Sequence, residues 1–299
     1  MTQSIHVHKW QNWTTLFMAV RSPLEKAVFL NMIGFLIILK VIEIINKYEN
    51  YPLVGKTYTV IYGILYTMRK QRIHDLIYRV AGPDMTDPRD SAVYLLDLGE
   101  PLLIDCGSGF AFDRVIQNIE EAGFYPAQIK NLILTHCHVD HIGGAHLFKS
   151  RFGSRLIMHE FDAKIVERAD QLLTAAFCFN IDFEPLHIET KITQEKELLR
   201  FGDYELFSLH TPGHTPGSIS LYIDIDNTRV LFAQDIGAPL LKEYDCDPSA
   251  WVESIQKLFA LDADILCDGH SGAYGPKKNV KRYLEFCVKS QAQQGYINP

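Results

Sequence analysis

Three histidines and one aspartate fall within six consecutive residues, and this segment restricts the chain more than any other feature. The four side chains are His136, His138, Asp140 and His141. The segment directly follows the short apolar run 132–134, so we expect it to leave the end of a buried strand. So dense a group of imidazoles and carboxylates is typical of a metal site rather than of a packed core.

The spacing of these residues suits two neighbouring metal ions. In an extended segment, residues i and i+2 point to the same side, so His136 and His138 can reach one ion together. Asp140 and His141 then turn with the chain toward a second ion. Imidazole nitrogens and carboxylate oxygens are ligands that Zn²⁺ prefers, and they also serve iron and manganese. For Cys137, between the two metal-facing histidines, we predict a packed thiol rather than a ligand.

Three further candidate ligands lie downstream, each where a predicted strand gives way to a loop. They are His214, Asp235 and His270. The strands predicted before them cover 205–209, 230–233 and 265–267. Strand ends gather distant side chains at one edge of a sheet, so we expect these ligands to join the first cluster. We expect three other histidines to be structural, namely His146, His159 and His210.

These motifs resemble those of the metallo-beta-lactamase-fold hydrolases. This superfamily includes class B beta-lactamases, glyoxalase II, lactonases and several phosphodiesterases. The resemblance covers about residues 76–275 and all five motifs of the family, which are carried here by Asp105, the 136–141 cluster, His214, Asp235 and His270. It implies an α/β fold, a four-layer αββα sandwich with the metals at one edge.

The resemblance also implies a division of the ligands between two ions. The first ion would take His136, His138 and His214, the second would take Asp140, His141 and His270, and Asp235 would bridge them. Asp105 would orient the ligand loop from behind the metals. We therefore expect catalysis to depend on Asp140 and Asp105. The expected cofactors are two divalent metal ions, with Zn²⁺ ahead of iron or manganese.

The region 71–299 contains turn signals at regular intervals between predicted strands and helices, as expected for a layered domain. Besides the strands before the ligands, apolar runs and alternation predict strands over 76–81, 92–98, 102–104 and 219–223. Helices are predicted over 112–122 and 280–288 and from Asp247 onward, where Asp247-Pro248 reads as a helix start. Two groups of strands with helices between them independently indicate a layered α/β domain.

The first 70 residues differ from the rest because they are apolar and poor in turn signals. Their centre, 27–45, is interrupted by Asn31, Lys40 and Glu43, so the uninterrupted apolar stretch is short for a membrane span. A cleavable signal peptide fits poorly, because no small-residue cleavage site follows. We expect an N-terminal extension over 1–70 and a hydrolase domain over 71–299. The extension is expected to form either a membrane-associated helix or an accessory helix. If its apolar surface is exposed, it would favour a homodimer.

The composition restricts the expected binding partners and the expected cellular compartment. The 299 residues carry a formal net charge of -7, so nucleic acid is not an expected partner. The six cysteines are scattered without a C-x-x-C pair, which indicates reduced thiols in a cytoplasmic protein. We therefore expect a small-molecule substrate.

The expected reaction is hydrolysis of a small ester, thioester or lactone by a hydroxide that bridges the two ions. In the family that the chain resembles, an aspartate at the position of Asp235 is typical of thioesterases, lactonases and phosphodiesterases, whereas class B beta-lactamases usually have a cysteine. The alternatives are a phosphodiesterase or beta-lactamase-type hydrolase of the same fold, and a non-catalytic metal-binding regulatory protein. We expect the segment 161–188, which contains Phe177, Phe179 and Phe183, either to wall the substrate pocket or to pack as ordinary core.

Overall fold

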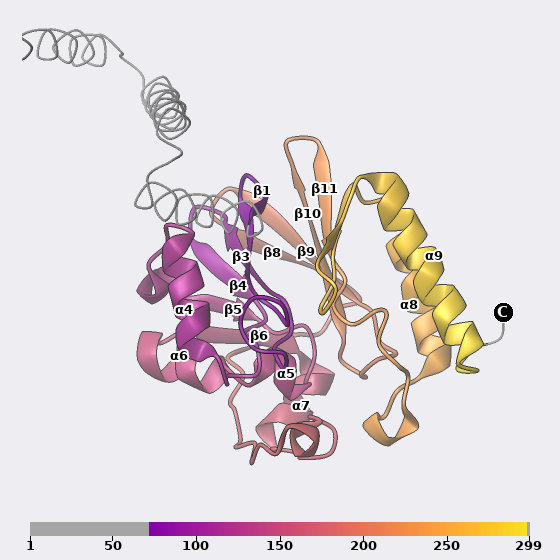
Figure 1. The fold of residues 1–299 in the computed structure, drawn as a ribbon, viewed down its shortest axis with the longest axis horizontal. Helices are drawn as coiled ribbons and strands as arrows, with labels where there is room; N and C mark the ends of the chain where they lie inside the picture. The colour runs from indigo at the N-terminus through magenta and orange to yellow at the C-terminus, as the bar shows by residue number, and fades with distance from the viewer. Residues whose placement is uncertain (1–71, 298–299) are drawn as a thin grey trace, which may run out of the picture. The chain divides into compact units, whose positions relative to one another are not determined.

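Two β-sheets face each other within residues 72–297, the part of the chain that this computed structural model describes (Figure 1). The first sheet contains, in chain order, β1 (Arg72–His74), β2 (Ile77–Ala81), β3 (Val93–Asp97), β4 (Pro101–Ile104), β5 (Asn131–Ile133), β6 (Arg155–His159) and β7 (Thr190–Ile192). The second runs β13-β12-β11-β10-β9-β8 and contains β8 (Lys196–Phe201), β9 (Tyr204–His210), β10 (Ile219–Ile225), β11 (Thr228–Phe232), β12 (Ile265–Cys267) and β13 (Ala273–Tyr274). The predicted extension over 1–70 lies outside the described residues.

Helices cover the outer face of each sheet, as Figure 1 shows. The first sheet carries α4 (Phe112–Glu121), α6 (Ala145–Phe152) and α7 (Glu160–Glu167). The second carries α8 (Pro248–Ala260) and α9 (Lys277–Gln293). Shorter turns are α5 (Val139–Ile142), η1 (Pro126–Gln128), η2 (Ala176–Phe179) and η3 (Lys242–Tyr244). The predicted four-layer αββα sandwich is therefore confirmed.

Side-chain alternation along the strands produces three apolar layers, which hold the four structural layers together. On β3, Val93 and Leu95 face the helices of the first sheet, whereas Tyr94 and Leu96 face the second sheet. All four are fully buried. Successive strand residues point to opposite faces, so a strand buried on both faces reads as a continuous apolar run. The third layer lies between the second sheet and its helices.

The strands that carry the predicted ligands end at a common edge. In the first sheet β4, β5 and β6 are parallel. In the second, β11 is parallel to β12, and β9 runs the same way because both β9 and β11 are antiparallel to β10. Backbone hydrogen bonds join the two sheets here: Ile219 N donates to Thr135 O at 2.9 Å, and Ala92 N donates to Gly269 O at 2.6 Å. Loops from both sheets therefore meet at one place.

The predicted strands and helices are all present within a few residues, but the sequence pattern missed several elements. The missed strands are β1, β6, β7, β8 and β13, and the missed helices are α5 and α7. Strand β8 lies at the edge of its sheet and is largely exposed, so its charged sequence carries little strand signal. Within residues 72–297, no helix combines the length and apolar character needed to cross a membrane.

Candidate metal centre

The structure brings the seven predicted ligands together at the shared edge of the two sheets. They fall into two clusters, His136, His138, His214 and Asp235 in one and Asp140, His141 and His270 in the other. The loop after β5 and the single helical turn α5 supply four of them. The remaining three follow β9, β11 and β12 in the second sheet. The site therefore depends on contact between the two sheets.

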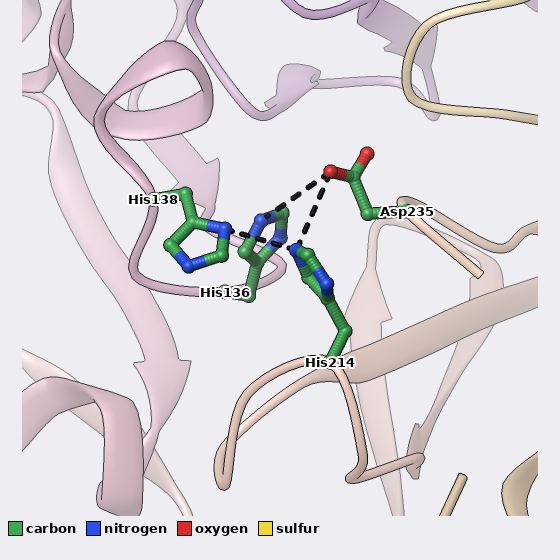
Figure 2. Close-up of side chains that lie close together, drawn as sticks. All are labelled: His136, His138, His214 and Asp235. Carbon is green, nitrogen blue, oxygen red and sulfur yellow. Dashed lines mark hydrogen bonds and ion pairs between the residues drawn. The ribbon is translucent and has the colours of Figure 1, made fainter. Parts of the chain in front are cut away.

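The first cluster converges on a common point, as Figure 2 shows. His138 Nδ1 lies 2.9 Å from His214 Nε2. One carboxylate oxygen of Asp235, Oδ2, lies 3.5 Å from His214 Nε2 and 3.9 Å from His136 Nε2. Ligand atoms around a tetrahedral ion with bonds of about 2.0–2.1 Å stand about 3.3 Å apart, so the observed spacings bracket those of a metal site.

The second cluster shares Asp235 with the first. Asp140 Oδ2 lies 3.6 Å from His141 Nε2 and 3.4 Å from His270 Nε2. The other oxygen of Asp235, Oδ1, lies 3.2 Å from each of these two imidazole nitrogens. Asp235 Oδ2 also approaches His270 Nε2, at 3.3 Å. Asp235 thus faces both clusters.

Buried ligand atoms without partners show that the residues fit a divalent cation. Among the described residues, His136 Nε2, His141 Nε2 and Asp235 Oδ1 make no hydrogen bond, although the last two atoms lie 3.2 Å apart as an ion pair. A buried polar atom left unpaired costs about 1–3 kcal/mol, a cost that a bound ion removes. The opposite ring nitrogens are held in place, because His141 Nδ1 donates to Asp105 Oδ2 at 2.7 Å and Thr135 Oγ1 lies 3.1 Å from His136 Nδ1. Each ring therefore directs Nε2 into the cluster.

The three imidazoles of the first cluster are neutral at pH 7. Burial lowers the pKa of His136 and His138 well below the ordinary value of 6.5. Burial likewise lowers the pKa of His214 to about 4. The neutral imidazole is the form that binds a metal, so these rings need lose no proton to do so.

The second cluster attracts positive charge more strongly. The Asp235 carboxylate raises the pKa of His270 to about 9. Burial opposes protonation of His141, but the carboxylates of Asp235, Asp140 and Asp105 outweigh it and raise the His141 pKa well above its ordinary value. A site that favours a proton this strongly also favours a metal cation, which takes the place of the proton on the ring nitrogen.

Asp105 lies behind the second cluster and is fully buried. Its Oδ1 accepts a hydrogen bond from the backbone nitrogen of Thr135 at 2.8 Å. Its Oδ2 accepts from Thr135 Oγ1 at 2.8 Å, from His141 Nδ1 at 2.7 Å and from Gln234 Nε2 at 2.8 Å. One carboxylate thus joins ligand-bearing segments of both sheets.

Sequence reasoning missed two buried residues that hold the ligand loops, Gln234 and Asp162. Gln234 donates from Nε2 to Asp105 Oδ2 and also to Ala92 O at 3.1 Å. Its only signal in the sequence was its place directly before Asp235. Asp162 lies on α7, outside every motif, so no motif spacing marked it.

Aromatic residues flank the first cluster. Tyr244 on η3 meets the edge of the His138 ring, with ring centroids 5.7 Å apart, and stacks on Phe177 of η2 at 6.3 Å. Phe177 is 54% exposed. Phe179 and Phe183 instead pack against the core of the first sheet. Of the three phenylalanines predicted either to wall a pocket or to pack, only Phe177 therefore stands beside the site.

Cys137 is packed as predicted and lies outside both clusters. Its Sγ donates to Leu173 O at 3.3 Å, and burial raises the pKa of the thiol well above the ordinary value. The protonated thiol is a poor nucleophile and a poor metal ligand. Among the described residues, the clusters also leave out the histidines expected to be structural, His146, His159 and His210.

Comparisons with known proteins agree with this geometry. The chain is 33% identical over 182 residues to a hydroxyacylglutathione hydrolase of Haemophilus influenzae, covering 58% of this chain and 82% of that protein. It is 26% identical over 120 residues to an N-acyl homoserine lactonase of a Bacillus species, covering 39% of this chain and 41% of that protein.

Solved structures show the same fold. A metallo-beta-lactamase variant from Cronobacter sakazakii superposes with a TM-score of 0.63 at 23% identity, over 75% of this chain and 95% of that chain. The model of the metallo-beta-lactamase superfamily matches residues 86–270, which span Asp105 and all seven clustered ligands. The chain therefore belongs to the metallo-beta-lactamase superfamily and is a metal-dependent hydrolase.

Proposed function

We propose that the chain is a dinuclear hydrolase that acts on a small ester, thioester or lactone, with two divalent ions, Zn²⁺ first among them. The observation that carries this proposal is the position of Asp235. Its Oδ2 faces His214 and His136, while its Oδ1 lies equally far from His141 and His270. A carboxylate between two sets of imidazoles is suited to bridge two ions.

Different residues of the chain have different roles in such a site. When bound, two divalent ions lower the pKa of a shared water and polarise the oxygen of the substrate. Asp235 holds the clusters at a fixed separation, and Asp105 holds the His141 ring in one orientation. No side-chain nucleophile is required, and the Cys137 thiol points instead to the Leu173 carbonyl.

The surroundings of the first cluster favour a substrate with an apolar arm. The exposed Phe177 stacks on the partly buried Tyr244, whose ring lies beside that of His138. Such rings bind apolar groups by excluding water and leave the polar reacting bond to the metals. The names of the two relatives point to the same class, since one denotes a hydrolase of an acyl thioester and the other a lactonase.

A substrate panel on the Zn²⁺-loaded protein, with its metal content measured, tests this proposal. We expect hydrolysis of at least one ester, thioester or lactone. Asp140→Ala should retain the fold by circular dichroism and lose at least about 10²-fold in kcat/KM, because it removes a buried charge at the reacting centre. The exposed change Asp224→Asn is the matched control and should keep full activity.

Other outcomes point away from the proposal. Faster turnover of phosphodiesters or beta-lactams than of every acyl substrate would assign the chain to one of those branches. Full activity in Asp140→Ala would remove the dinuclear mechanism. No hydrolysis of any substrate, with both sites loaded, would favour a metal-binding regulatory protein.

A further inference from the structure

A third buried carboxylate, Asp162, holds the two loops that carry the first cluster. Asp162 lies in the first turn of α7 and is fully buried. Its Oδ2 accepts hydrogen bonds from Cys137 N at 2.8 Å and from Thr215 Oγ1 at 2.6 Å. Its Oδ1 accepts from Gly217 N at 2.6 Å. All three donors belong to ligand-bearing loops, and none is itself a ligand.

These donors follow strands of different sheets. Cys137 separates His136 from His138 in the loop after β5. Thr215 directly follows His214 in the loop after β9. One carboxylate therefore joins the two sheets at the first cluster. It links the residue after His214 to the residue between the other two imidazoles.

The close approach of Asp162 depends on Gly217. A Cβ atom at this position would lie 2.4 Å from the backbone nitrogen of Asp162 and 2.5 Å from its Oδ1, so a larger residue would displace the carboxylate. Ser218 reinforces the same turn, because its Oγ accepts from Thr215 N at 3.1 Å and lies 2.7 Å from Thr215 Oγ1. The loop after β9 is thus built around its bonds to Asp162.

We propose that Asp162 is a positioning residue that sets the spacing of the first cluster and thereby its affinity for a divalent ion. The inference rests on the metal site of the proposed function. Asp105 holds the second cluster by touching His141 directly, whereas Asp162 acts through the backbone beside His138 and His214. All the side-chain bonds of Asp162 go to segments beside first-cluster ligands, so its loss should affect the first ion.

The Zn²⁺ affinity of the full-length, metal-free protein tests this, measured by competition with a chromophoric chelator. An amide at Asp162→Asn offers only one acceptor oxygen and turns its NH₂ toward former donors, so Cys137 N or Gly217 N loses its partner. We expect one binding step to weaken about 10–100-fold, as is typical when the support of a metal ligand is removed. The other step should stay within about twofold. The control Asp224→Asn, which removes an exposed partner of Arg229, should change neither step.

Repeating the affinity measurement in two further variants shows to which cluster the weakened binding step belongs. With the first cluster disabled by His214→Ala, Asp162→Asn should cause no further loss of affinity. With the second disabled by His270→Ala, the full loss should remain. Equal losses in both backgrounds, or no loss in either, overturn the proposal. Because hydrolysis is not measured, failure of the proposed substrate class would leave this result intact.

A milder pair of variants covers the case in which Asp162→Asn does not fold. Thr215→Val removes one of the three hydrogen bonds at nearly constant volume, whereas Thr215→Ser keeps the hydroxyl. We expect Thr215→Val to weaken the same binding step and Thr215→Ser to restore it. In the metal-free protein, Asp162→Asn should also speed hydrogen exchange at the amides of Cys137 and Gly217. Equal affinity in the two Thr215 variants, or unchanged exchange at both amides, would refute the role.

Discussion

Two aspartates of the site adopt backbone conformations that most residues avoid. Asp105 has a φ of 60° and Asp235 a φ of 56°, both in the left-handed region. Aspartate enters this region more readily than larger residues, but the conformation still costs free energy. The bonds from Thr135 and Gln234 to Asp105 hold this geometry in place. At these aspartates, the surrounding hydrogen bonds therefore outweigh the local conformational preference of the backbone.

Gln234 offers a prediction at the scale of one residue. Its orientation is unambiguous, because the two groups it faces, Asp105 Oδ2 and Ala92 O, only accept hydrogen bonds. Gln234→Leu leaves both without this donor, so we expect the free energy of unfolding to fall by about 1–3 kcal/mol. Urea unfolding with a chelator present measures this. The exposed change Gln117→Ala should shift it by less than about 0.5 kcal/mol, and an equal shift in both variants would contradict the prediction.

At the scale of elements, helix α8 shows that two adjacent residues can determine where a helix begins. Asp247 precedes Pro248, the first residue of α8, and its Oδ1 accepts from Ser249 N at 2.8 Å and Ala250 N at 3.1 Å. These amides have no partner within the helix, so the side chain supplies it. The Trp251 side chain then packs into the third apolar layer. This helix start was predicted from two adjacent residues.

The cap can be tested by itself. Asp247→Ala should lower the free energy of unfolding by about 1 kcal/mol, the usual value for a lost N-cap. Asp247→Ser keeps an oxygen acceptor and should stay within about 0.5 kcal/mol of the natural protein. Urea unfolding of the three proteins under identical conditions compares them. A loss as large for serine as for alanine would show that the cap is not the cause.

At the scale of the described unit, two stacked histidines join the sheets beside the metal centre. His159 ends β6 and His210 ends β9, and their rings lie 4.0 Å apart with an angle of 5° between the ring planes. Burial, followed by the neighbouring His210, lowers the pKa of His159 to about 4. The His159 Nδ1 atom accepts a hydrogen bond from Phe161 N at 3.3 Å, which requires that nitrogen to be unprotonated.

The protonation of His159 makes stability depend on pH. Between about 6.5 and about 4, His159 takes up a proton in the unfolded chain but stays neutral in the fold, so stability present above 6.5 is lost as the pH falls. One pKa unit corresponds to about 1.4 kcal/mol, so the shift from 6.5 to about 4 sets this loss at no more than about 3 kcal/mol. His159→Asn keeps an acceptor for Phe161 N and removes the titration. The stability gap between natural protein and variant should narrow from pH 7.5 to pH 4 in the presence of chelator, and parallel curves would exclude the effect.

Much of the fold and the seven candidate ligands could be named from the sequence, because many of the signals are local. Alternation on β3 and the Asp247-Pro248 pair act within a few residues, and the spacing of His136 and His138 places both on one side of an extended segment. The edge strand β8 was not predicted, because an exposed strand lacks the apolar pattern by which strands are recognised in a sequence. The ligand assignment also drew on family resemblance, since spacing does not say which distant residues share an ion.

The sequence by itself determined which side chains are suited to bind metal and that each leaves the end of a strand. Only the tertiary structure decided that loops of two sheets meet, that Asp235 faces both clusters, and that Asp162 and Gln234 hold the loops in place. The physical reason is distance along the chain. The hydrogen bond from Thr215 to Asp162 joins segments from different sheets, and no local pattern in either segment records its partner.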